Sequence, residues 1–234
     1  GSYNESDTEP KELNKTGEFE QTDLGIEYQL KNTRLEKYTV SLGLQRLRER
    51  ERSTFSYITD DTFFDQTETL ELKIKSLNLS FFDKWTMRAE SALKTDTARF
   101  GGRKYSNSNL SRTGATTNFM KWSGSIKMNR GLPFNLQLRN HLNFQKLITD
   151  KGVINAEQIG ITGSEQLSGF VSGHMAGDEG YFIRSEIGRF FYPFYNNEAE
   201  IEKDDTIRIR PYLHAAYGAT FFKQPASGEY PRLE

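Results

Sequence analysis

Cysteine is absent from this chain of 234 residues, which excludes a disulfide framework and a thiolate metal site. Proline is scarce, at six residues, and no apolar run approaches the roughly 18 residues that a membrane-spanning helix needs. An excess of one charge is also lacking, because 31 basic residues stand against 32 acidic ones. A nucleic-acid-binding protein would show a basic excess, so we expect no nucleic-acid partner.

Strict alternation of apolar and polar residues is what the sequence does have. Leu70, Leu72 and Ile74 alternate with Glu71 and Lys73, for example, and a period of two predicts β-strands. No stretch shows a convincing helical period. Most of the predicted strands exceed the roughly 5–6 residues of ordinary strands and reach the ~9–11 residues of a tilted bilayer-crossing strand. We place eight strands at residues 22–31, 35–50, 67–79, 84–96, 116–129, 133–146, 180–192 and 205–218.

The connections between these strands alternate in length. Short turns on one side and long loops on the other are typical of transmembrane β-barrels. The predicted short turns are 32–34, 80–83 and 130–132, and the predicted long polar loops are 51–66, 97–115 and 147–179. Alternation alone equally describes a soluble antiparallel sheet with one wet face, so a soluble β-rich binding protein stays an alternative.

The predicted fold class is an all-β, antiparallel transmembrane β-barrel. We expect residues 1–21 to be a polar loop or N-terminal extension and residues 22–234 to be the barrel segment. With 32–34 as a periplasmic turn, the first and last strands both end on the long-loop side. A complete bacterial barrel begins and ends on the other side, so we expect an internal part of a larger barrel.

In such a barrel, alternate side chains of each strand face lipid and lumen. The apolar positions expected to face lipid are Trp85, Met87, Trp122, Ile126, Leu136, Leu138, Ile207 and Ile209. The polar positions expected to face the lumen, where charge is tolerated, are Arg88, Lys121, Lys127, Gln137, Arg139, Arg208 and Arg210.

Four stretches carry a specific pattern. They read "NFMKWSGSIKMNRGLPFNLQLRNHLNFQ" (118–145), "AEQIGITGSEQLSGF" (156–170), "GDEGYFIRSEIG" (177–188) and "PYLHAAYG" (211–218). The third closely resembles the G-D-x-G-(Y/W)-x-x-R-x-E strand of the two-partner secretion translocators, the haemolysin activation and secretion family. The other three are similar to that family's hairpin, loop and F-x-D-x-G strand.

The resemblance implies a sixteen-stranded outer-membrane barrel, preceded in the family by two POTRA domains. It also implies ATP-independent export of a partner exoprotein, an unfolded, β-helix-forming polypeptide. We therefore expect contacts with the lipid bilayer and lipopolysaccharide, a monomeric state, no covalent chemistry and no cofactor. An insertase similar to BamA, which shares the loop and strand motifs, is an alternative.

The resemblance further implies that loop 147–179 folds into the lumen. Its tip, V-R-G-(F/Y) in the family, falls on Leu167, Ser168, Gly169 and Phe170. The strand that closes the loop carries Gly177, Asp178, Gly180, Tyr181, Arg184 and Glu186, and the strand that receives it carries His214, Ala216 and Gly218.

This sequence departs from the family pattern at two charged positions. Ser168 replaces the tip arginine, and Ala216 replaces the aspartate that pairs with it. Losing both charges avoids leaving one buried alone. We expect docking of the tip to rest on neutral hydrogen bonds and on packing of Phe170.

Other candidate chemistry in the sequence is weak. The histidines His141, His174 and His214 lie on different predicted elements without metal-ligand spacing. Asp178 and Glu179 are adjacent, so on an extended chain their carboxylates point to opposite faces and suit acid–base chemistry poorly.

Overall fold

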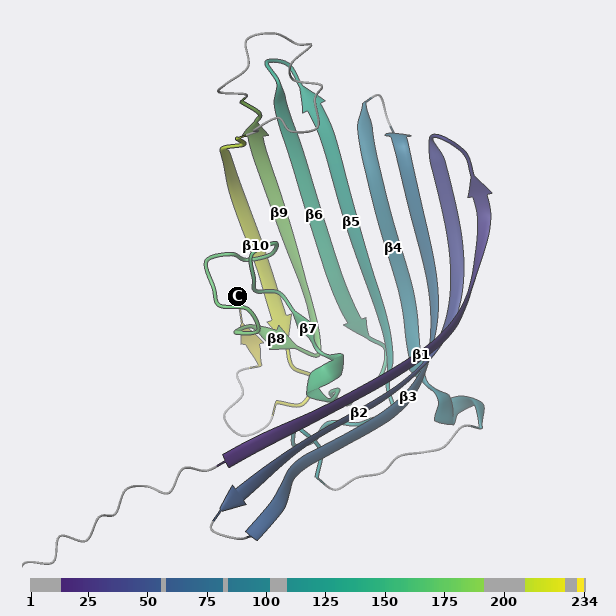
Figure 1. Ribbon diagram of the computed structural model, residues 1–234, viewed down its shortest axis with the longest axis vertical. Helices are drawn as coiled ribbons and strands as arrows, with labels where there is room; N and C mark the ends of the chain where they lie inside the picture. The colour runs from purple at the N-terminus through teal and green to yellow at the C-terminus, as the bar shows by residue number, and fades with distance from the viewer. Residues whose placement is uncertain are drawn as a thin grey trace, which may run out of the picture.

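A computed structural model describes residues 14–55, 58–81, 84–101, 109–191, 209–225 and 231–233 of the chain (Figure 1). These residues form one nine-stranded antiparallel sheet in the order β1-β2-β3-β4-β5-β6-β9-β10-β11. Its strands are β1 (Asn14–Asn32), β2 (Glu36–Phe55), β3 (Ile58–Phe81), β4 (Trp85–Asp96), β5 (Met120–Leu132), β6 (Leu136–Leu147), β9 (Glu179–Arg189), β10 (Tyr212–Phe221) and β11 (Arg232–Leu233).

The remaining elements are short. A second sheet pairs β7 (Ile159–Gly160) with β8 (Ala176–Gly177), and both lie in the connection between β6 and β9. The helical turns η1 (Thr97–Phe100) and η2 (Asn155–Glu157) have three or four residues each. Across the described ranges, no helix is long and apolar enough to cross a membrane.

The two ends of the strands differ only in part as expected from the alternating loop lengths, because residues 56–57 join β2 to β3 and residues 190–211 join β9 to β10. Turns 33–35 and 133–135 join neighbouring strands at one end of the strands, and this end of the sheet is named here the short-turn edge. Connections 97–119 and 148–178 leave the opposite, long-loop edge, where β1 also begins and β10 ends. The all-β, antiparallel fold class predicted from the alternation is confirmed.

The predicted boundaries at the N-terminal end were wrong. β1 begins at Asn14, inside the segment 1–21 that was assigned to a loop or extension. Residues 51–66 were predicted as a long loop. Instead, residues 51–55 continue β2 and residues 58–66 belong to β3. Cross-strand partners explain this extension: Arg48 pairs with Glu20 at 3.3 Å, and the guanidinium of Arg50 lies 5.2 Å from the ring centre of Phe64.

The β5–β6 turn was placed three residues too early. Gly131 looked like a turn residue, but it lies within β5 and pairs with Gln137. The turn is made by Phe134 and Asn135, which have positive φ angles of 64° and 58°. Asparagine tolerates this conformation better than most residues, whereas phenylalanine does so rarely, so a turn at Phe134 was hard to predict from the sequence.

Large apolar side chains cover one face of the sheet and are exposed. This outer face carries Leu24, Ile26, Leu42, Leu72, Ile74, Trp122, Ile183, Leu213 and Tyr217, each at least 45% exposed. A continuous exposed apolar face indicates a surface that is covered by something other than water. Of the positions predicted to face lipid, Trp85, Met87, Trp122, Ile126, Leu136 and Leu138 share this face by register, and Ile209 follows from its pairing with Phe191. Ile207 lies outside the described residues.

Aromatic side chains gather at both ends of the outer face. Near the long-loop edge Trp122 meets Phe144 edge to face, with ring centres 4.7 Å apart. Near the short-turn edge Arg130 lies over Trp85. From Trp122 to Arg130 the strand runs about 26 Å, or roughly 20 Å along the membrane normal at a ~40° tilt, close to the ~25 Å apolar band of outer-membrane barrels.

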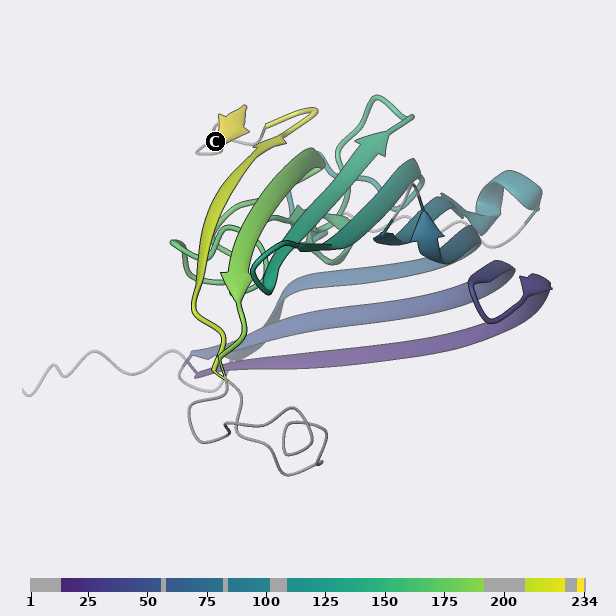
Figure 2. The same cartoon turned by 90° about the horizontal axis from the view of Figure 1, so that it is seen from above.

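The opposite face is polar and concave. Figure 2 shows the sheet curling around the connection between β6 and β9. By register this inner face carries Arg88, Lys121, Lys127, Gln137 and Arg139. Arg210, two residues before the start of β10, lies on the same face. Arg208 lies outside the described residues.

Candidate functional site

The connection 148–178, named here the inserted segment, lies inside the curl of the sheet (Figures 1 and 2). A buried apolar cluster holds its middle part, and the cluster consists of Ile159, Ile161, Leu167, Met175 and Phe182. Only Phe182 belongs to a strand of the large sheet. The segment therefore carries most of its own small core to the inner face.

Gly218 and Gly180 make room for this cluster. A Cβ added at Gly218 would lie 2.8 Å from the backbone oxygen of Tyr181 and 3.2 Å from Ile161. A Cβ at Gly180 would lie 2.8 Å from the oxygen of Ala219 and 3.2 Å from Ile159. Glycine at these two positions lets the inserted segment approach the sheet closely.

Asp178 is the first polar anchor of the inserted segment and is completely buried. Its carboxylate accepts two hydrogen bonds from one nitrogen of Arg112, at 2.9 and 3.0 Å. The backbone amides of Val153 and Lys223 donate to the same carboxylate at 2.9 and 2.8 Å. Arg112 also donates to the oxygen of Gln224 at 3.0 Å, so this one ion pair joins three separate loops.

The neighbouring Glu179 points the other way, as the alternation along an extended chain predicts. Lys146 contacts it at 2.7 Å and Lys223 at 3.2 Å, and the amide of Leu147 donates to it at 3.2 Å. Glu179 thus fastens the beginning of β9 to the end of β6.

Glu157 in η2 is the second anchor, with 2% of its side chain exposed. Lys94 and Lys121 each contact one of its carboxylate oxygens, at 2.6 and 2.8 Å. Burial opposes ionisation of Glu157, but the two ammonium groups outweigh it and hold the pKa of the carboxyl below its ordinary value. Glu157 therefore stays charged inside the curl.

Backbone oxygens of the inserted segment complete the second anchor. Lys121 donates to the oxygen of Glu157 at 2.7 Å and to Gln145 at 3.1 Å. The amide of Gln145 donates to the oxygens of Glu157 and Asp178, both at 3.0 Å. One glutamine on β6 therefore ties both anchors together.

The third anchor lies beneath the tip of the inserted segment. Arg184 on β9 is 8% exposed and donates to the backbone oxygens of Ser164 and Gln166, at 2.9 and 3.1 Å. Its other nitrogen donates to Glu186 at 3.3 Å, and Arg210 forms a second ion pair with Glu186. Arg184 thus serves the segment directly, and Glu186 holds Arg184 in place.

At the tip itself, the hydroxyl of Ser168 lies 2.9 Å from Nε2 of His214. His214 pairs with Glu186 in the sheet register, and Ala216 pairs with Arg184, one inward-facing position further along β10. Ser168 therefore contacts His214 rather than Ala216. A serine–histidine hydrogen bond occupies the region that the resemblance assigns to an arginine–aspartate pair.

Within the described residues, Phe170 supplies little of the packing expected of it. Phe170 is 49% exposed, and its ring stacks on His174 of the same segment, with ring centres 6.3 Å apart. The buried tip residue is Leu167, at 8% exposure. Gly169 between them is exposed. The hydrophobic anchor thus lies three residues before the position predicted.

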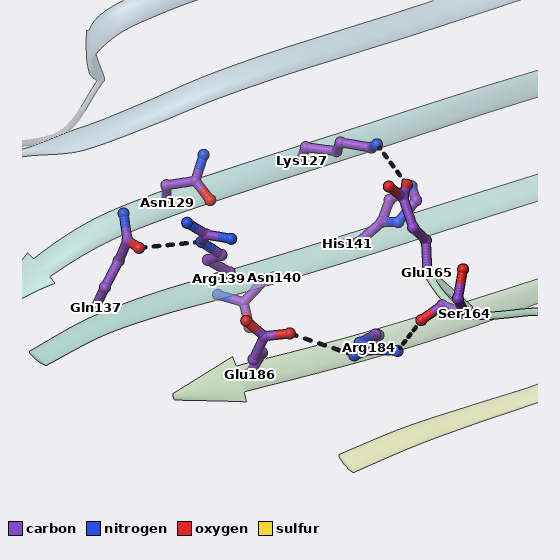
Figure 3. Close-up of a pocket in the computed structure, with 10 residues that line it drawn as sticks. All are labelled: Lys127, Asn129, Gln137, Arg139, Asn140, His141, Ser164, Glu165, Arg184 and Glu186. Atoms are coloured by element: carbon purple, nitrogen blue, oxygen red, sulfur yellow. Dashed lines mark hydrogen bonds and ion pairs between the residues drawn. The ribbon is translucent and has the colours of Figure 1, made fainter. Parts of the chain in front are cut away.

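A cavity of about 330 Å³ opens between the tip and the sheet (Figure 3). Lys127, Arg139 and Arg184 supply its cations, and Glu165 and Glu186 supply its carboxylates. Lys127 reaches Glu165 at 3.6 Å. A second hollow, of about 540 Å³, separates η2 from β1 and β2. In the stretches that the structure describes, no group of three or more histidine, aspartate or glutamate side chains could hold a metal ion.

Three anchoring residues were not singled out from the sequence: Arg112, Glu157 and Lys94. Arg112 is a single basic residue in a polar loop, and nothing in its neighbours marks it. Lys94 has the same strand parity as Arg88, so the alternation rule could have placed it on the inner face. Glu157 stands just before Ile159 and Ile161. The alternation of these two apolar residues indicates where the inserted segment begins to pack against the inner face.

Comparison with known proteins identifies the family to which this chain belongs. The sequence model of the family described as haemolysin secretion/activation protein ShlB/FhaC/HecB matches residues 2–229. The chain belongs to this family. Members of the haemolysin secretion/activation family are outer-membrane β-barrel transporters of Gram-negative bacteria, so the family is one of secretion pores rather than enzymes. No curated protein sequence matches the chain.

Two solved structures share the fold of this haemolysin secretion/activation family member. CdiB from Escherichia coli is 14% identical, with a TM-score of 0.66 over 92% of this chain and 43% of its own. CdiB from Acinetobacter baumannii is 13% identical, with a TM-score of 0.59 over 93% of this chain and 34% of its own. The chain thus spans less than half the length of these structures.

Leu167 offers a test of the tip geometry in this family member. Leu167→Ala should lower the free energy of unfolding of the full-length protein by about 2–5 kcal/mol, because it empties a buried site. Phe170→Ala, at a half-exposed position, should change it by no more than about 0.5 kcal/mol. Urea unfolding in detergent, followed by tryptophan fluorescence, measures both; a larger loss for Phe170→Ala would contradict the assignment.

Proposed function

We propose that this chain is the part of an outer-membrane two-partner secretion transporter that carries its inserted segment, and that the full-length protein exports one partner exoprotein. The observation that carries the proposal is the set of three anchors that hold residues 148–178 against a polar inner face. An apolar outer face of bilayer height supports the membrane setting. The family match over residues 2–229 supports the transport role.

In this proposal the inserted segment is a movable obstruction. Its tip is held by Arg184, by the Ser168–His214 hydrogen bond and by the weak Lys127–Glu165 pair, whereas its base is held by the buried charges of Asp178 and Glu157. A neutral hydrogen bond contributes only ~1 kcal/mol net, and an exposed ion pair less. The exposed contacts of Ser168 and Glu165 can therefore be released at low cost, while the buried Leu167, the Arg184 bonds and the base stay in place. No bond in the exported chain is made or broken.

The lipid-facing surface implies bilayer and lipopolysaccharide contacts, and we expect the full-length protein to act as a monomer. The role of the tip, the closing strand and the receiving strand in docking stays a prediction.

The function is tested by deleting the gene for the full-length protein in its host. One exoprotein, or very few, should disappear from the medium and accumulate as unfolded periplasmic chain, and a plasmid copy should restore export. Mass spectrometry of the medium and of the outer membrane measures this. A general fall in outer-membrane proteins would indicate the insertase alternative instead, and an unchanged medium would refute export.

A further inference from the structure

We propose that the 330 Å³ cavity beneath the tip is an anion-binding site that takes a carboxylate side chain of an extended, acidic polypeptide segment. The identity of the ligand as a polypeptide rests on the proposed export function. Its negative charge follows from the residues of this chain alone.

Basic residues form a row across the inner face at this level. Arg88, Lys127, His141 and Arg184 are successive cross-strand partners on β4, β5, β6 and β9. Neighbouring strands lie about 4.8 Å apart, so the four side chains follow one another at close spacing. Figure 3 shows Lys127, His141 and Arg184 around the cavity, with the Arg139 side chain among the lining residues.

The carboxylates of the described residues neutralise this row and the neighbouring Arg139 only in part. Among the residues that the structure describes, Arg88 has no ion-pair or hydrogen-bond partner, and Arg139 donates only to the neutral Gln137, at 3.0 Å. Glu186 is already shared by Arg184 and Arg210. The guanidinium of Arg139 therefore retains donors for an incoming carboxylate, with which arginine forms paired hydrogen bonds.

The remaining acid, Glu165, indicates how the site would act. It lies two residues before the tip residue Leu167, its side chain is 81% exposed, and its oxygen lies 3.6 Å from Lys127, longer than a good ionic hydrogen bond. An arriving carboxylate would compete with Glu165 for Lys127. Binding of an acidic segment would then weaken one of the contacts that hold the tip down.

The space fits a peptide segment rather than a single ion. A volume of about 330 Å³ lies in the range of ~300–1,000 Å³ typical of organic ligand sites. The cavity lies between the tip and the short-turn edge, so a chain that enters from that edge meets it before it meets the inserted segment.

The test uses the full-length protein in detergent and a fluorescent peptide of alternating glutamate and glycine. A peptide with glutamine in place of glutamate is the neutral control, and anisotropy gives the affinities. We expect the glutamate peptide to bind at least about tenfold more tightly at low salt. Arg139→Gln should remove most of that preference, whereas Glu165→Gln should increase it, because the competing carboxylate is gone.

Lys75→Gln is the matched control. Lys75 is also a cation of the inner face, 3.8 Å from Glu27, but it does not line the cavity. The proposal is overturned if both peptides bind equally, or if Lys75→Gln costs as much preference as Arg139→Gln. Sulfate binding without binding of the glutamate peptide would overturn the polypeptide assignment.

Folding and function are separated by two further readouts. Heat-modifiable mobility on gels must show that each variant is folded, and Lys127→Gln, at a second cation that lines the cavity, repeats the test if Arg139→Gln is not. Continued secretion without any charge preference would refute this site alone. Loss of the export function with an intact charge preference would refute the proposed function and leave the anion site standing.

Discussion

Asp178→Ala is expected to lower the free energy of unfolding of the full-length barrel by about 3–5 kcal/mol. The substitution leaves the guanidinium of Arg112, whose side chain is 3% exposed, buried without its counter-charge. It also strips the amides of Val153 and Lys223 of their acceptor, and each unsatisfied buried donor adds its own cost. No other single side chain of the inserted segment has so many partners among the described residues.

Urea titration in detergent measures this loss, and Asp150→Asn is its control. Asp150 lies on the same segment but is exposed, so its replacement should change the midpoint little. Asp178→Asn keeps an acceptor oxygen and should fall between the two. Equal stability of Asp178→Ala and Asp150→Asn would show that the buried ion pair does not hold the segment.

Glu157→Gln should be the second most damaging change, at roughly 3–5 kcal/mol, because it leaves Lys94 and the buried Lys121 facing each other without a carboxylate. The effect also has a pH signature. The pKa of Glu157 in the folded protein is lowered from 4.5, so its contribution is complete above about pH 4.5 and is lost as the pH falls further.

Unfolding titrations at several pH values between about 3 and 7 test this sign. The difference in stability between the parent protein and Glu157→Gln should be constant from neutral pH to about pH 5, and should shrink below about pH 4.5. The comparison cancels every other carboxylate that the two proteins share. A difference that grows on acidification would show that burial, rather than the lysines, controls Glu157.

The strands and their faces could be predicted because a period of two determines both at once. The alternation in residues 120–128 assigns Trp122 outward and Lys121 inward without any knowledge of the neighbours, and the register agrees. Turn positions were less predictable. The choice between Gly131 and Phe134 depends on the pairing of Leu132 with Leu136, which is a property of two strands rather than of one.

The anchors of the inserted segment were the least predictable part. Arg112 and Asp178 are separated by 66 residues, and no local pattern connects them. The family resemblance pointed to Ser168 and Ala216, whereas the structure brings Ser168 to His214. Which buried residue supports the tip depends on the depth to which the segment sinks, and the sequence does not encode that depth locally.

The ion pair between Arg112 and Asp178 also has a kinetic consequence. Arg112 precedes β5, Asp178 precedes β9, and Gln224, 112 residues after Arg112, follows β10, so the full set of bonds forms only when all these strands are aligned. Because the entropy of closing such long loops is lost before the bonds form, we expect these contacts to form late in folding. Interactions absent from the transition state slow unfolding without speeding folding. The ion pair therefore stabilises the sheet only after its strands are assembled. Its removal should shorten the lifetime of the assembled barrel and leave the rate of assembly unchanged.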